Sequence, residues 1–160
     1  MRLLVRAGTR EVGGRPAREF LVGGPDTPGR EAWLWDLSFV SPATTCDAAE
    51  VGLLTVDFDD VPERVCLRFN ERMLTAELAT TRVPPHEPLI LRRQVSELVV
   101  IVPRDGGVVE DARMVEAGDT LVVEGPDPAQ IRLAVTGDTP ATMLIGWLRR
   151  RDGKPVRWMP

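Results

Sequence analysis

Apolar and polar residues alternate along most of the chain, as they do in β-strands that are buried on one face. In the segment Arg64–Phe69, three apolar residues fall on one face, and Cys66 with the two arginines falls on the other. Segments 33–40 and 131–136 alternate in the same way. Successive side chains of a strand point to opposite faces, so this pattern predicts half-buried antiparallel strands. Further strands are predicted at Arg2 to Arg6, Ala17 to Val22, Leu53 to Phe58, Met73 to Ala79, Leu89 to Arg92, Leu98 to Val102, Thr120 to Glu124 and Ala141 to Leu148.

Short turn signals separate the expected strands. They lie at Gly23–Asp26, Pro84–Pro85, Asp105–Gly107, Gly118–Asp119, Pro126–Pro128 and Thr136–Asp138. No segment shows a helical stripe of ordinary length, and the best candidate for a single helical turn is Cys46 to Glu50. About ten short strands separated by turns are typical of a β-sandwich or barrel. We therefore predict one all-β domain over residues 1–160.

The charges of the chain are nearly balanced and dispersed. There are 20 basic and 24 acidic residues, the formal net charge is -4, and the basic runs at 92–93 and 149–151 are short. Proteins that bind nucleic acid normally carry a basic face, so we expect no nucleic-acid partner. No apolar run approaches the roughly 20 residues that cross a bilayer, so we expect no membrane insertion.

The chain contains two cysteines, Cys46 and Cys66, which form neither a disulfide framework nor a zinc site. We expect no signal peptide, a cytoplasmic location and two free thiols, because the cytoplasm is reducing. Cys66 shares a predicted strand face with Arg64 and Arg68, whose charges would favour a thiolate. The plainer interpretation of Cys66 is a small apolar residue on a strand.

Three segments resemble the HutD/Ves family of small bacterial proteins. That family opens with a Trp-Lys-Asn-Gly-Gly-Gly-x-Thr-Arg-Glu-Ile signature, and Gly13–Gly14 with Arg18–Phe20 fall at matching spacing. A Trp-x-Leu-Ser strand of the family is matched by Trp35–Ser38, and its Gly-Asp-Thr-Leu-like turn is matched within Gly118–Gly125. The segment Leu144 to Arg149 is similar to the last strand of the family.

The resemblance implies a cupin-like (RmlC-like) antiparallel β-barrel or double-sheet sandwich, which is a jelly roll. It also implies a role in histidine-utilisation control or in a stress response, through a ligand similar to a formylated glutamate. The chain departs from the signature, because Arg10, Glu11 and Val12 replace its Trp, Lys and Asn, while Arg15 and Ala17 replace its third Gly and its Thr. We therefore expect a small acidic or polar metabolite as the partner.

The matched motifs supply the candidate ligand-binding residues, which are Arg18, Glu19, Trp35 and Ser38. Adjacent strand residues point to opposite faces, so only one of Arg18 and Glu19 faces the barrel interior. An inward Arg18 would hold a carboxylate through bidentate hydrogen bonds. The alternative is a salt bridge that fastens the N-terminal strand, and the sequence leaves both interpretations open.

The residue types exclude several kinds of chemistry. A metal-dependent cupin needs about three imidazoles with a carboxylate, but His86 is the one histidine, so we expect no metal and no cofactor. His86 follows two prolines and is expected in an exposed loop. No Gly-x-Ser-x-Gly elbow of a hydrolase occurs. The glycines at 13–14 and 106–107 open no helix and therefore indicate turns rather than phosphate sites.

Three functions remain open. The first is a non-metal protein that binds a small acidic or polar metabolite and has a sensing or regulatory role. The second is a cofactor-free isomerase or epimerase-like enzyme, which needs an acid–base pair such as His86 with a carboxylate, or an acid with Arg. The third is a homodimeric interaction module, because edge strands of β-proteins must be paired or blocked.

Overall fold

The structure, a computed structural model, describes residues 2–5, 11–12, 15–16, 20–22, 35–40, 43, 52–57, 64–126 and 129–156. Strands and turns account for these residues, and no helix occurs among them. Within the same described ranges, there is accordingly no helix of the length and apolar character that crossing a membrane requires. The all-β prediction is confirmed, while the helical turn expected at 46–50 lies outside the described residues.

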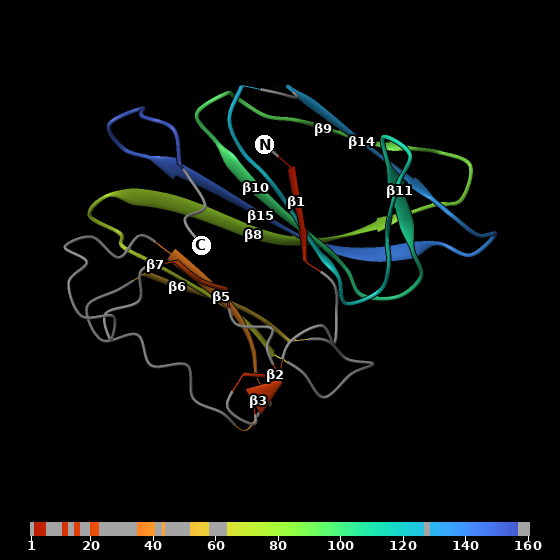
Figure 1. The fold of residues 1–160 in the computed structure, drawn as a ribbon, viewed down its shortest axis with the longest axis horizontal. Helices are drawn as coiled ribbons and strands as arrows, with labels where there is room; N and C mark the ends of the chain where they lie inside the picture. The colour runs from red at the N-terminus through yellow and green to blue at the C-terminus, as the bar shows by residue number, and fades with distance from the viewer. Residues whose placement is uncertain are drawn as a thin grey trace.

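The strands form three larger antiparallel sheets, which we call the central, C-terminal and N-terminal sheets (Figure 1). The central sheet contains, in spatial order, β1 (Arg2–Val5), β13 (Thr120–Val123), β10 (Leu98–Pro103), β15 (Ala141–Arg150) and β8 (Leu74–Val83). The C-terminal sheet contains β12 (Arg113–Val115), β11 (Val108–Glu110), β14 (Gln130–Val135) and β9 (Leu89–Arg92). The N-terminal sheet contains β4 (Phe20–Val22), β5 (Trp35–Val40), β7 (Arg64–Phe69) and β6 (Gly52–Asp57). A separate two-stranded pair consists of β2 (Glu11–Val12) and β3 (Arg15–Pro16).

The central sheet is covered on both faces. In β10, Leu98, Val100 and Val102 pack in one apolar cluster with residues of the N-terminal sheet. The alternate residues of the same strand, Val99 and Ile101, pack in a second cluster with residues of the C-terminal sheet. Each cluster is therefore the filling between two sheets, and the molecule has three layers (Figure 1).

Burial on both faces explains why the central strands are apolar without alternation. All six residues of β10 and all four residues of β13 are buried. Strands with one solvated face alternate instead. In β14, Gln130 and Arg132 are exposed, while Ile131 and Leu133 are buried. The central and C-terminal sheets together form the double-sheet sandwich that the strand pattern predicts, and its architecture is the cupin-like one that the family resemblance implies.

The N-terminal sheet turns its aromatic face toward the central sheet. Trp35, Leu37 and Phe69 belong to the cluster between these two sheets, and Trp35 is fully buried. The ring of Phe69 lies over Gly52, its register partner on β6. A Cβ atom added at Gly52 would lie 2.5 Å from the ring carbon Cζ, so a larger residue here would force the ring to move.

The hairpin β11–β12 was not expected from the sequence. Its turn residues Asp111 and Ala112 have φ angles of 50° and 64°. A two-residue turn of type I′ has positive φ at both central residues, and Asn-Gly or Asp-Gly is the usual signal for such a turn. The pair Asp-Ala lacks that signal, so the local sequence does not predict the two short strands beside it.

Candidate functional site

The interior of the jelly roll is filled with aliphatic side chains. Those that meet between the central and C-terminal sheets are Val83, Leu91, Val99, Ile101, Val108, Val115, Leu121, Val123, Ile131, Leu133, Ala141, Met143 and Ile145. A ligand site needs convergent polar groups beside its apolar lining. No group of three or more His, Cys, Asp and Glu side chains that could hold a metal occurs among the described residues. Among the residues that the structure describes, the space between these two sheets is thus a packed apolar core.

Charged side chains at the margins of the jelly roll are held by ion pairs or by hydrogen bonds to the backbone. At one margin, Arg2 Nε of β1 lies 2.8 Å from Glu110 Oε1 of β11, which joins the central sheet to the C-terminal sheet. Burial raises the pKa of Glu110, although the charge of Arg2 acts in the opposite direction. At another margin, Arg93 donates to the backbone oxygens of Glu97 and Gly125. The first contact thus joins two sheets, and the second holds the turns that contain Glu97 and Gly125.

The N-terminal sheet carries its polar residues on the face turned away from the central sheet. There Asp36 on β5 lies directly across from Arg68 on β7. Arg68 Nε donates to Asp36 Oδ1 over 2.9 Å, and Nη2 lies 2.7 Å from Oδ2, so the pair is bidentate. The side chain of Asp36 is 2% exposed and that of Arg68 is 31% exposed. A buried carboxylate therefore orients a guanidinium that reaches solvent.

The next row of the same face contains Ser38, Cys66 and Thr55, which are register partners on β5, β7 and β6. Ser38 is half-buried and Thr55 is exposed. Cys66 is buried and disulfide-bonded. The expectation of a free thiol at Cys66 is therefore wrong, and a nucleophilic role for it is removed. The free thiols were expected from a reducing cytoplasm, and a disulfide at Cys66 does not fit that expectation. Cys46 lies outside the described residues.

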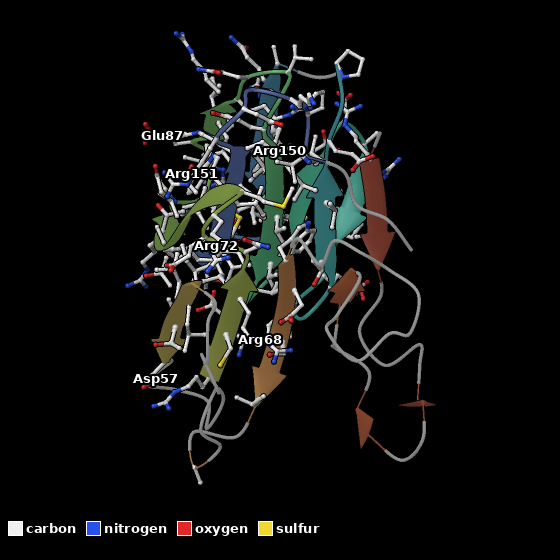
Figure 2. The ribbon with its side chains drawn as sticks, turned by 90° about the vertical axis from the view of Figure 1, so that its left-hand side faces the viewer. Asp57, Arg68, Arg72, Glu87, Arg150 and Arg151 are labelled. Carbon is white, nitrogen blue, oxygen red and sulfur yellow. The ribbon has the colours of Figure 1, made fainter. Side chains whose placement is uncertain are left out.

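A second ion pair on this face is exposed. Arg64 on β7 lies across from Asp57 on β6, and Nε and Nη2 donate to the two carboxylate oxygens over 2.5 and 2.9 Å. The hydrogen bond from Arg64 lowers the pKa of Asp57. Figure 2 shows Arg68 and Asp57 on the N-terminal sheet, away from Arg72, Arg150 and Arg151. The pairs Asp36–Arg68 and Asp57–Arg64 thus differ mainly in the burial of the acid.

The predicted site residues fall into three groups. Ser38 lies on the polar face, one row from Asp36. Trp35 points to the opposite face of the same sheet and is part of the core. Trp35 and Ser38 are therefore separated by the sheet itself. Arg18 and Glu19 lie outside the described residues and stay predictions.

His86 occupies the exposed loop between β8 and β9, as predicted. Its side chain is 80% exposed, its φ is 67°, and its Nε2 lies 3.8 Å from Oδ1 of the exposed Asp138. An exposed pair at this distance contributes little to stability. A histidine-based acid–base pair inside the barrel would need His86 to point inward, and it does not.

The pairing of Asp36 with Arg68 was missed by sequence reasoning. Both residues were visible as polar positions on alternating strands. Their contact depends on the register between β5 and β7, which are joined through a long connection that contains β6. The usable signal was an aspartate beside two core residues, because an ionised side chain is rarely buried without a partner.

No protein-family model matches the sequence, and no curated protein matches it. Among solved structures, the chain is similar to PA5104, a conserved protein of unknown function from Pseudomonas aeruginosa PAO1. The two share 16% sequence identity with a TM-score of 0.55, and the similarity covers 94% of this chain and 99% of that chain. The likeness shows a common fold.

Proposed function

We propose that the protein binds a small acidic metabolite on the polar face of the N-terminal sheet, as a non-metal, HutD/Ves-like binding protein with a sensing or regulatory role. The observation that carries the proposal is the Asp36–Arg68 pair. A guanidinium held by a buried carboxylate is preorganised, and Arg is the side chain whose planar fork fits a carboxylate in two hydrogen bonds. Asp36 orients the guanidinium of Arg68 through Nε and Nη2, and the side chain of Arg68 is 31% exposed.

The surroundings of the pair support binding of a polar ligand. Ser38 supplies a hydroxyl, which donates and accepts hydrogen bonds, on the same face and strand as Asp36. Thr55 on β6 supplies a second hydroxyl and is exposed; it lies two positions along β6 from Leu53, the register partner of Arg68. Binding without turnover is proposed because Asp36 is engaged by Arg68 and His86 lies away in its exposed loop.

The test compares two arginines of one strand face in a thermal-shift assay. The probes are acetate, succinate, glutamate and N-formylglutamate, with phosphate as a non-carboxylate anion. We expect at least one carboxylate to raise the melting temperature of the wild-type protein and of Arg64→Met. The same carboxylate should leave Arg68→Met unshifted, because the oriented guanidinium is gone.

Circular dichroism of Arg68→Met establishes that the variant is folded before its binding is compared. The proposal fails if no carboxylate shifts the wild-type protein. It fails equally if folded Arg68→Met keeps the full shift, since the anchoring cation would then lie elsewhere.

A further inference from the structure

Strand β8 forms one edge of the central sheet and is among its two longest strands. It covers the 10 residues Leu74–Val83 and pairs along its whole length with β15. Within the part of the chain that the structure describes, no strand pairs with its other side. In Figure 1, β8 lies below β15, at the lower margin of the central sheet. An edge of this length is a template for another strand.

The hydrogen bonds around β15 show which groups of β8 point outward. Arg104 N donates to Thr142 O over 2.8 Å, so Thr142 turns its backbone polar groups toward the β10 side of β15. The neighbouring Met143 must then turn toward β8 and bond with its register partner Thr81. At the other end, Arg151 N donates to Met73 O over 2.9 Å, which agrees with this alternation.

Odd-numbered residues of β8 therefore bond to β15, and even-numbered residues direct their N–H and C=O groups to the free edge. Apart from Leu74, whose N–H is bonded to Asn70 O in the preceding turn, the outward residues are Ala76, Leu78, Thr80 and Arg82. Ala79 and Thr80 are both exposed, although their side chains point to opposite faces of the sheet. The edge is thus open on both sides at this point, and the outward groups there can reach a partner strand.

We propose that the partner is a second copy of this chain, whose β8 pairs antiparallel with β8 around a two-fold axis at Thr80. A two-fold axis perpendicular to a sheet makes an edge strand complementary to itself, because each N–H of one copy meets a C=O of the other. The strand is rich in threonine, a residue that favours extended structure. The two five-stranded central sheets would become one continuous sheet.

The side chains fit this register. Thr80 meets Thr80 of the partner subunit, a cross-strand pair that stabilises sheets. Arg82 then lies across from an aliphatic residue, Leu78, on which its methylene stem can pack. Glu77 lies across from Val83. Neither charge of β8 therefore opposes a like charge, which is the arrangement that self-pairing requires.

Sedimentation of the full chain from low-micromolar to the highest soluble concentration tests the proposal. We expect the wild-type protein to dimerise as the concentration rises. Thr80→Pro removes the outward N–H at the axis in both copies, and proline is tolerated at an edge position of this kind. Losing these two hydrogen bonds should raise the dimer dissociation constant about tenfold or more. Thr80→Val keeps the N–H and should dimerise as the wild-type protein does.

A second pair of variants covers the case in which Thr80→Pro does not fold. Ala79→Lys places two ammonium groups close to the axis and should weaken the dimer, more strongly at low salt. Ala79→Thr adds no charge and should leave the dimer as strong as that of the wild type. A wild-type protein that stays monomeric at every concentration overturns the proposal. So does a folded Thr80→Pro or Ala79→Lys protein that dimerises like the wild type. Carboxylate binding at Arg68 is read separately by thermal shift, so either proposal can fail alone.

Discussion

The two sheets that cover the central sheet are alike on their inner faces and opposite on their outer faces. Both present buried apolar residues inward. Outward, the C-terminal sheet exposes scattered side chains such as Ile90, Arg132 and Met114. The N-terminal sheet instead buries an aspartate, Asp36, on its outer face, where it pairs with Arg68. Burying a charge is costly unless it is paired and oriented, so this exception is the observation on which the proposed site rests.

The largest effect should come from the inner face of the C-terminal sheet. Leu133→Ala removes a fully buried side chain from the jelly-roll core and should cost about 2–5 kcal/mol of unfolding free energy. Ile90→Ala, on the outer face of the same sheet, should change it by no more than about 0.5 kcal/mol. Urea unfolding measures both. Equal costs would contradict the packed interior.

A smaller but more specific loss is expected on the outer face of the N-terminal sheet. Asp36→Asn keeps the shape of the side chain but removes a charge-assisted pair, which is worth about 1.5–3 kcal/mol. Asp57→Asn breaks an exposed pair and should leave unfolding unchanged. Asp36→Asn should also weaken carboxylate binding, because Arg68 loses its orientation. If the two variants had the same free energy of unfolding, the buried and the exposed ion pair would not differ in strength.

The glycines test how tightly the N-terminal sheet packs. Gly52→Ala forces the ring of Phe69 to move and should cost about 1–3 kcal/mol. Gly146→Ala on β15 meets Leu78 at 3.6 Å, an ordinary contact, and should cost less. Chemical denaturation of both variants gives the comparison. A larger cost at Gly146 would show that the central sheet, rather than β6, has the tighter surface.

The smallest effect concerns pH and the margin between the central and C-terminal sheets. Burial raises the pKa of Glu110 above the ordinary glutamate value of about 4.3. The folded state therefore favours the protonated acid, and the stability this gives at low pH is lost as pH rises through the raised pKa. Glu110→Gln cannot ionise, so it should gain stability relative to the wild type between pH 4 and neutrality. Urea unfolding at both ends of this range measures the gain, and an opposite trend would mean that Arg2 outweighs burial.

Local patterns predicted single strands well. The bounds of β7 and β9 match the expected segments residue for residue, because strict alternation or clear turns delimit them. The three layers could not be predicted, since alternation shows that a strand has two faces but not which sheet covers each. The continuous apolar run of β10 was the clue to burial on both faces.

The candidate site was predictable only in part. Ser38 was singled out from its motif, and it lies on the polar face beside Asp36. Arg68 was singled out for its position beside Cys66 rather than for a contact with Asp36. That contact depends on the long-range register of β5 with β7, which no local pattern contains. The roles of Arg18 and Glu19 stay predictions.

The position of β1 has a consequence for the order in which the chain can fold during synthesis. Arg2–Val5 pairs with Thr120–Val123, which lies far along the chain. During synthesis the first strand must therefore stay unpaired in this sheet until the segment that contains β13 has been made. Contacts between such distant segments close late and slow folding. We therefore expect the central sheet to be completed late in folding, after the segments that form β13 and β15 are available.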